Sequence, residues 1–171
     1  VLAPRHVGAI ADGTDGASLA TPTGVVVQGN YAYVISDVTT DSFQVFDISD
    51  PVNITRVGTL LDGSAGASFT APADLFIQGN YAYIAAQSDG LAIIDVSDPS
   101  NPRYAGQLLN GQGGAQLETP LDVFVAGNYA YLGVQQTGAT DGLTIIDIAD
   151  PKNPRYVGSI LEGAGGALLD V

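Results

Sequence analysis

The sequence predicts an all-β chain made of β-propeller blades, each of them a four-stranded antiparallel sheet. Two motifs that each occur three times in 171 residues carry this prediction. The first is Gly-Asn-Tyr-Ala-Tyr, at residues 29–33, 79–83 and 127–131. The second is Asp-x-x-Asp-Pro, at residues 47–51, 95–99 and 147–151. Successive copies lie 48 to 52 residues apart, which is the size of one blade in an array of repeats.

The first two strands of each repeat are expected on either side of the Gly-Asn pair. Gly-Asn between apolar segments predicts a tight hairpin, because such a turn requires positive φ values that these residues tolerate. First strands are expected at residues 24–28, 75–78 and 121–126, and second strands at 31–35, 81–85 and 129–134.

The third and fourth strands complete each blade. Third strands are expected at residues 43–48, 91–96 and 143–148, and fourth strands at 56–61, 103–109 and 155–161. Strands two and three are apolar at nearly every position, which predicts burial on both faces. A four-stranded antiparallel sheet covered on both faces by its like is a propeller blade. The 22 glycines and 9 prolines interrupt any competing helix.

The repeats divide the chain into one short leading segment and three blades within a single propeller segment. The leading segment is expected to hold an extra outer strand of a preceding blade and a crossover, because residues 5–10 align with the fourth strands. Three blades fall short of the usual ring of four to eight. We therefore expect an incomplete ring, either one arc of a longer propeller that begins at a processed or cut end or a subunit completed by assembly. The expected ranges are 1–22, 23–72, 73–120 and 121–171.

Charge and composition narrow the range of partners. The net charge is −13 and only 13% of residues are charged, about half the usual share. An acidic chain is repelled by nucleic-acid phosphates and by anionic lipid surfaces, so neither partner is expected. Membrane insertion is not expected either, because no apolar run is long enough to span a bilayer. The absence of Cys and Met excludes disulfides and thiolate ligands and suits an extracellular location.

The repeats resemble the LVIVD-repeat family of β-propellers. Its pattern, Gly-Asn-Tyr-Ala-Tyr followed by Gly-Leu-x-Ile-Ile-Asp-x-Ser-Asp-Pro-x-Asn-Pro, is matched best at 79–83 and 90–102, and nearly as well at 142–154. The first repeat departs from it at 42–46 and 52–54. The resemblance implies a propeller of a bacterial or archaeal surface or secreted protein, and it supplies no catalytic motif.

Candidate binding residues lie in the loops at one end of the blades. This end carries the loops between second and third strands and the long crossovers between blades, and such variable loops on a rigid frame often bind ligands. Calcium prefers carboxylate and carbonyl oxygens, so it is the cofactor that these loops could hold. The alternative is that they are solvated acidic loops with Asp-Gly turns. The candidate calcium ligands are Asp15, Asp37, Asp41, Asp89 and Asp141.

Two further aspartates, Asp74 and Asp122, begin innermost strands and are expected at the channel mouth. A ring of carboxylates there could hold a cation or a basic side chain, although Gly24 breaks the ring in the first repeat. The alternative is that each carboxylate accepts backbone N–H bonds at the crossover. The aspartates that end third strands are expected to bind the backbone of the Asp-Pro turn.

No catalytic constellation is recognisable. His6 is the only histidine, no Gly-x-Ser-x-Gly elbow is present, and zinc needs more His or Cys than the chain has. Asn53-Ile54-Thr55 fits the N-glycosylation pattern, and we expect a chance match. The tyrosine pairs of the first motif are expected to pack between blades.

These observations favour a non-catalytic interaction, adhesion or scaffold module of an extracellular or cell-surface protein. Its partner would be another protein, or further blades or copies of itself. One alternative is a self-assembling subunit of a filament or sheath, whose open blade edges the next copy completes. Another is a fragment of a propeller hydrolase or lyase whose acidic face performs the chemistry.

Overall fold

A computed structural model describes residues 3, 5–136 and 141–162 of the chain. It contains three separate four-stranded sheets whose strands follow chain order, each strand paired antiparallel with the next. This arrangement confirms the predicted all-β fold of propeller blades. None of the described residues forms a helix that is long and apolar enough to cross a membrane.

Each sheet is one blade, and we number the blades 1 to 3. Blade 1 consists of β1 (Pro22–Gln28), β2 (Tyr31–Ser36), β3 (Ser42–Asp47) and β4 (Thr55–Leu61). Blade 2 consists of β5 (Pro72–Gln78), β6 (Tyr81–Ala86), β7 (Gly90–Asp95) and β8 (Arg103–Leu108). Blade 3 consists of β9 (Thr119–Ala126), β10 (Tyr129–Gln135), β11 (Gly142–Asp147) and β12 (Arg155–Leu161). The innermost strands begin one or two residues before the expected blade boundaries.

The Gly-Asn hairpins form as the sequence predicts. Gly29, Gly79 and Gly127 have φ values of 61°, 60° and 59°, in the left-handed region that glycine adopts without strain. The strands on either side of the first turn pair from Gln28 with Tyr31 outward, and the other two turns have the same register. This register directs the same repeat positions to the same face of every blade.

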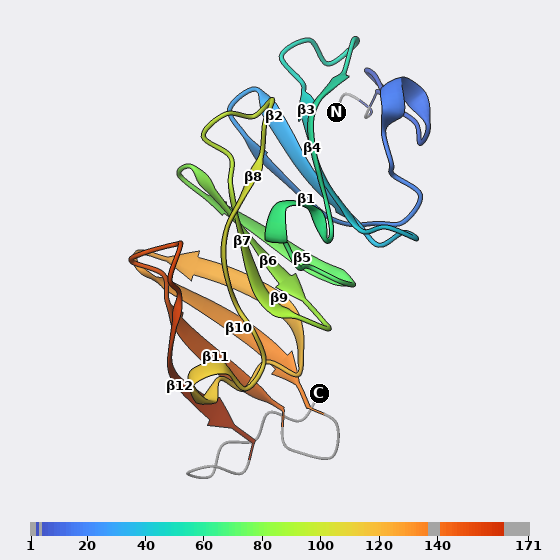
Figure 1. Ribbon diagram of the computed structural model, residues 1–171. Coiled ribbons are helices and arrows are strands. Elements are labelled where there is room, and N and C mark those ends of the chain that lie inside the picture. Colours follow the sequence, from blue (N-terminus) through green and yellow to red (C-terminus); the bar gives the residue numbers. More distant parts are fainter. Residues whose placement is uncertain (1–2, 4, 137–140, 163–171) are drawn as a thin grey trace.

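The blades are arranged as in a propeller. Figure 1 shows the three sheets one after another in chain order. Contacts between neighbouring blades concentrate on the innermost strands β1, β5 and β9, and on β2 and β6 next to them. The two hydrophobic clusters lie between the blades, one between blades 1 and 2 and the other between blades 2 and 3. The core of this chain therefore consists of blade-to-blade interfaces.

A short 3₁₀ turn lies in each crossover that leads into a blade. These turns are η1 (Thr14–Gly16), η2 (Ser64–Gly66) and η3 (Gln112–Gly114), and they contact β4, β8 and β12, respectively. A side chain at the start of each crossover accepts a backbone N–H seven residues later. The pairs are Asp12 with Leu19 (2.7 Å), Asp62 with Phe69 (2.8 Å) and Asn110 with Leu117 (2.9 Å).

Residues 5–10 take the position expected for an outer strand but pair with no sheet. The structure assigns no strand to these residues. Their place is nevertheless that of a fourth strand. Gly8 lies so close to the Pro51 carbonyl that a Cβ would overlap it, as would one on Gly58 at the Pro99 carbonyl. Residues 5–10 thus pack at the place where the alignment expects a fourth strand, but they do not form one.

Candidate functional site

The surfaces through which blades contact one another are built from the same repeat positions in every blade. We call the side of a blade turned toward the next blade its forward face, and the opposite side its backward face. Between blades 1 and 2, the forward residues Phe43 and Leu60 share a buried cluster with the backward residues Leu75 and Ile77. Between blades 2 and 3, the corresponding forward residues are Leu91 and Leu108, and the backward residues are Val123 and Val125.

The forward face of blade 3 carries the same apolar positions without a covering blade. Leu143 is 36% exposed and Ile160 is 52% exposed, whereas Leu91 and Leu108 of blade 2 are 1% and 3% exposed. Further apolar side chains extend this surface: Phe124, Tyr129 and Val157. Contiguous exposed apolar side chains of this kind are typical of contact surfaces. We take it as the candidate functional site.

A glycine in each fourth strand forms the deepest point of the blade-to-blade contact. A Cβ on Gly58 would overlap the Pro99 carbonyl, and one on Gly106 would overlap the Pro151 carbonyl, so the Asp-Pro turn of the next blade fits only against glycine. At Gly158, in blade 3, a Cβ would meet nothing within 4 Å. Blade 3 therefore has the notch that receives an Asp-Pro turn, but no turn fills it among the described residues.

Polar bonds between the innermost strands fix how one blade sits on the next. Gln28 Nε2 donates to the Gly79 carbonyl, and Gln78 Nε2 donates to the Gly127 carbonyl, each over 2.9 Å. Thr23 Oγ1 donates to the Pro72 carbonyl over 2.6 Å. Blade 3 has Ala126 where the other blades have glutamine, so it lacks this hydrogen-bond donor.

The structure brings Asp74 and Asp122 together across the junction of blades 2 and 3. Asp74 Oδ2 accepts the backbone N–H of Val123 over 2.9 Å. Burial raises the pKa of Asp74, and the hydrogen bond with the Asp122 carboxyl raises it further. Gly24 holds the same place in blade 1, where a Cβ would meet Ile35 and the Leu75 side chain. The described residues thus place a carboxyl pair at this junction, and Asp74 has the backbone role named as its alternative.

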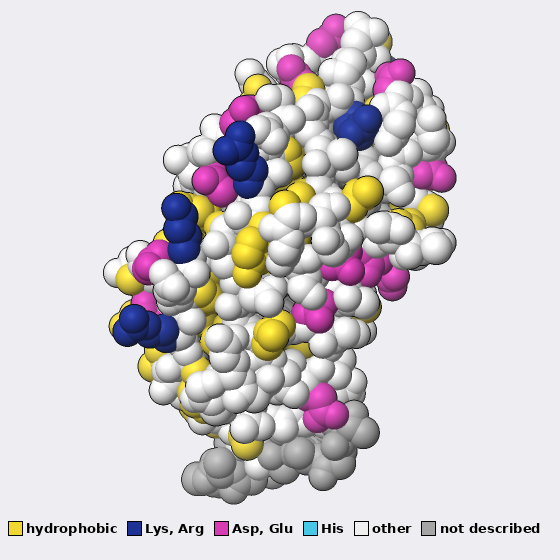
Figure 2. Space-filling view, viewed as in Figure 1, with side chains coloured by type: hydrophobic (Ala, Val, Ile, Leu, Met, Phe, Trp, Pro, Cys, Tyr) yellow, Lys and Arg dark blue, Asp and Glu magenta, His cyan; other side chains and the backbone are white. Residues whose placement is uncertain are grey.

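The five candidate calcium ligands lie in four segments, because Asp37 and Asp41 share the loop between β2 and β3, and several of their carboxylates bind backbone N–H groups. Asp41 accepts the N–H of Val38 (3.1 Å) with one oxygen and that of Ala71 (2.7 Å) with the other. Asp89 accepts the N–H of Thr70 over 2.6 Å. Within the described ranges, no three His, Cys, Asp or Glu side chains come together as metal ligands. Figure 2 shows acidic side chains on several parts of the face in view.

The remaining three candidates also lie in separate crossovers and loops. Asp15 has a φ of 49° in the η1 turn, and its carbonyl accepts a bond from Arg56 Nε over 3.1 Å. The backbone N–H of Asp37 donates to the Thr21 carbonyl, and Asp141 Oδ1 accepts the N–H of Gln136 over 3.1 Å. These contacts hold loops to blades, and calcium binding at these residues stays a prediction.

The aspartates of the repeated turns bind backbone, as predicted. Asp47, Asp95 and Asp147 each accept the N–H of the residue two positions later, over 2.8 to 2.9 Å. Hydrogen bonds from the side chain and then the backbone N–H of Ser49 hold the pKa of Asp47 below its usual range. In blades 1 and 2 the tyrosines of the first motif pack between blades, and Tyr33 and Tyr83 are almost fully buried, whereas Tyr129 of blade 3 is exposed.

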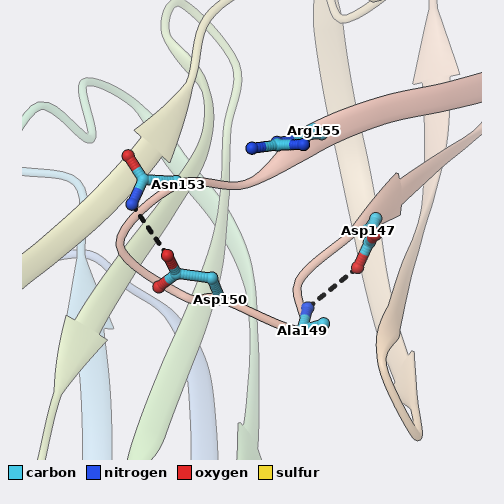
Figure 3. A pocket seen from close by; sticks show the side chains of 5 residues that line it. All are labelled: Asp147, Ala149, Asp150, Asn153 and Arg155. Atoms are coloured by element: carbon cyan, nitrogen blue, oxygen red, sulfur yellow. Dashed lines mark hydrogen bonds between the residues drawn. The ribbon is translucent and has the colours of Figure 1, made fainter.

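A hollow of about 210 Å³ lies at the last of these turns, in blade 3. Figure 3 shows that its two carboxylates are already engaged, Asp147 with the N–H of Ala149 and Asp150 with Asn153 Nδ2. Arg155 lines the same hollow. In blade 1, the Nδ2 of Asn53 donates in the same way to Asp50 Oδ2 over 2.7 Å. His6 is exposed and lies in the leading segment.

Sequence reasoning missed the fourth-strand glycines and the innermost-strand glutamines as contact residues. A signal for the glycines was present, because Gly8, Gly58, Gly106 and Gly158 occupy one repeat position in strands where glycine is otherwise unfavourable. The glutamines gave a weaker signal, because only two of the three repeats carry them. In addition, a polar side chain at the end of a strand is ordinary.

Comparison with known proteins agrees with this geometry. The chain resembles the computationally designed Ika8 protein (TM-score 0.53, 12% identity) over 81% of its own length and 36% of that chain. It resembles a hypothetical selenium-binding protein from Sulfolobus tokodaii (TM-score 0.56, 11% identity) over 74% of its length and 37% of that chain. The designed Ika4 protein is matched at a TM-score of 0.52 and 9% identity, over 91% of this chain and 100% of that one.

The chain therefore spans well under half the length of the first two of these structures. At such low identities the likeness concerns the fold alone. No curated protein matches the sequence. The family model of the LVIVD repeat matches residues 22–62, 72–109 and 120–162, which contain the strands of the three blades apart from Thr119, the first residue of β9. By these three matches, the chain belongs to the LVIVD-repeat family.

Proposed function

We propose that this chain is a non-catalytic interaction and scaffold module of an extracellular or cell-surface protein, and that it acts through the forward face of blade 3. The family match supports a repeat module, and the uncovered face supplies the place of contact. A partner that covers this face would bury the positions that are buried between the blades of the chain itself.

The single observation that carries the proposal is the contrast between equivalent positions. Leu108 of blade 2 is 3% exposed and Ile160 of blade 3 is 52% exposed, although strand, register and face are the same. Together with the notch at Gly158, which no described residue fills, this contrast supports a contact surface on blade 3. Burying such apolar area stabilises association by roughly 25 cal/mol per Å² before the costs of binding.

Two observations favour a non-catalytic role over a hydrolase or lyase. The carboxylates of the repeated turns and of Asp41 bind backbone N–H groups, so they hold loops in place. The hollow at the turn of blade 3 has both its carboxylates engaged as well.

A photo-crosslinking amino acid at position 143 tests the proposal in extracts and cell-surface fractions of the source. We expect a crosslinked protein, and we expect it to disappear when Gly158→Phe fills the notch. The matched control carries the crosslinker at position 80, in the exposed Gly-Asn turn of blade 2. The proposal would be contradicted if position 143 gave no crosslink. It would also be contradicted if the crosslink persisted in the Gly158→Phe variant.

A further inference from the structure

We propose that Asn53 is the acceptor of an N-linked glycan, which the Asp-Pro turn of blade 1 presents at the surface of the chain. The acceptor pattern is Asn53-Ile54-Thr55, and it occurs once in the sequence. Such glycans are carried by surface segments of secreted proteins. The proposal goes beyond the interaction role and shares with it only the extracellular location.

The acceptor pattern arises in blade 1 from two departures from the repeat. The equivalent residues are Asn101-Pro102-Arg103 in blade 2 and Asn153-Pro154-Arg155 in blade 3. Proline in the middle position prevents glycosylation, and arginine lacks the hydroxyl that the third position needs. Blade 1 has isoleucine and threonine instead, so both obstacles are removed in the same turn.

The shape of the turn does not account for these departures. The backbone N–H of Asn53 donates to the Asp50 carbonyl over 3.0 Å, and that of Asn153 donates to the Asp150 carbonyl over 2.9 Å. The side-chain bonds of the same two pairs, from Nδ2 to Oδ2, measure 2.7 and 2.8 Å. The turn therefore folds in the same way with either sequence.

The threonine also gives the turn no electrostatic advantage. In blade 2, hydrogen bonds from Ser100 lower the pKa of Asp98, and the positive charge of Arg103 lowers it further. Thr55 takes the place of this arginine in blade 1 and is neutral, so Asp50 lacks the corresponding cation. What Thr55 supplies in exchange is the hydroxyl that completes the acceptor pattern.

The turn leaves the acceptor accessible. Asn53 and Thr55 are both exposed, so a modifying enzyme reaches both ends of the pattern. The amide nitrogen Nδ2 of Asn53 has two hydrogens and donates to Asp50 Oδ2, so a sugar can replace one hydrogen while the other keeps this bond. Val52 beside it is 63% exposed, and the first sugar would lie next to this apolar side chain.

The modification is a glycosyl transfer from an oligosaccharide that is bound through its anomeric carbon to a lipid-linked diphosphate. A bond forms between Nδ2 of Asn53 and the anomeric carbon. The bond from that carbon to the diphosphate oxygen breaks, and the oxygen keeps the electron pair. Nδ2 loses one proton, so the product is a neutral amide with one N–H left.

Mass spectrometry of tryptic peptides from the protein isolated from its source tests the proposal. Cleavage after the arginines gives one peptide of residues 6–56, which contains Asn53, and one of residues 57–103, which contains Asn101. We expect a glycan on the first peptide, located at Asn53 by fragmentation, and none on the second. An unmodified peptide 6–56 would overturn the proposal.

Variants made in the same source separate the acceptor pattern from the fold of the turn. Thr55→Arg and Ile54→Pro each restore the residue of the other blades and keep Asn53, and each should abolish the glycan completely. Thr55→Ser keeps the hydroxyl and should keep the glycan. A glycan that persists in the Thr55→Arg variant would show that this pattern does not direct it, and would overturn the proposal.

A matched gain of function uses the turn of blade 2. The double substitution Pro102→Ile and Arg103→Thr creates the same pattern in a turn that is built in the same way, and it should add a second glycan at Asn101. If this variant gained none while Asn53 stayed modified, the statement that the turn itself presents the acceptor would be overturned.

The crosslinking experiment separates this proposal from the proposed function. A crosslink at position 143 in a chain with unmodified Asn53 would contradict the glycan alone. A glycan at Asn53 in a chain without that crosslink would contradict the interaction role of blade 3 alone.

Discussion

Blade 2 and blade 3 share their strand pairing and most of their repeat residues, yet blade 2 is covered on both faces and blade 3 on one. Leu91 and Leu143 occupy the same place in their blades, and their exposures are 1% and 36%. The difference shows that a repeat encodes the face, whereas the neighbouring blade decides whether that face is buried. Pairs of equivalent substitutions in the two blades can therefore separate the contribution of a neighbour from that of the strand itself.

The largest expected difference comes from the pair Leu91→Ala and Leu143→Ala. Leu91→Ala leaves a cavity between blades 2 and 3 and should lower the free energy of unfolding by about 2–5 kcal/mol. Leu143→Ala removes a partly exposed side chain and should cost roughly 1 kcal/mol or less in dilute solution. Urea unfolding measures both values, and equal losses would contradict the comparison.

A smaller difference in stability is expected when the aspartate at the start of the crossover is removed in blade 2 and in blade 1. Asp62→Ala removes the acceptor for the N–H of Phe69, whose side chain is fully buried, and should cost about 1–3 kcal/mol. Asp12→Ala removes the acceptor for Leu19, where the bond is exposed, and should cost about 1 kcal/mol or less. Thermal unfolding of both variants measures the two losses of stability. A larger loss for Asp12→Ala than for Asp62→Ala would contradict the prediction.

A third pair of substitutions concerns the last residue of the innermost strand, which is glutamine in blades 1 and 2 and Ala126 in blade 3. Gln78→Ala deletes the bond to the Gly127 carbonyl and should destabilise the chain by about 0.5–1.5 kcal/mol. Ala126→Gln adds the donor to blade 3, beyond which the structure describes no further blade to accept it, so its unfolding free energy should change by less than about 0.5 kcal/mol. A marked stabilisation of the dilute monomer by Ala126→Gln would show that this face is already covered.

The smallest expected effect is the pH dependence of stability that Asp74 contributes at the junction of blades 2 and 3. The folded-state pKa of Asp74 is raised, so its ionised form opposes folding at neutral pH, and this cost fades as the pH falls through that pKa. Asp74→Asn has no such cost and can still accept the N–H of Val123.

The melting temperature of Asp74→Asn minus that of the native chain should therefore be larger at pH 7 than at pH 3.5. The aspartates of the exposed turns have lowered pKa values and lose their stabilising contribution on acidification, equally in both chains. A difference that is the same at both pH values would show that Asp74 does not carry the effect.

The sequence was sufficient to predict the four-stranded blades, because two local rules determine them. The Gly-Asn pairs require a hairpin, and apolar strands on either side of each hairpin require burial on both faces. The roles of Asp47 and its equivalents followed from position alone, since a side chain two residues before an N–H in a turn binds it in any blade.

The candidate site on the forward face of blade 3 could not be predicted in the same way. What distinguishes this face is that no described blade covers it, and the residues of one repeat do not reveal that. Val157 and Val57 read alike in sequence, and only the arrangement of blades shows that one of them lacks a neighbour. Likewise, Asp41 was a reasonable metal ligand in sequence, and the structure shows its two oxygens bound to N–H groups of two different loops.

Hydrogen–deuterium exchange of β8 and β12, in the chain alone and bound to the protein crosslinked at position 143, tests the central claim most directly, namely that the forward face of blade 3 is a contact surface. β8 is covered by blade 3 within the chain, so its exchange should be the same in both samples. The account predicts that exchange in β12 is slower in the complex and approaches the rate of β8. Exchange in β12 that stays fast in the complex while β8 stays protected would contradict it.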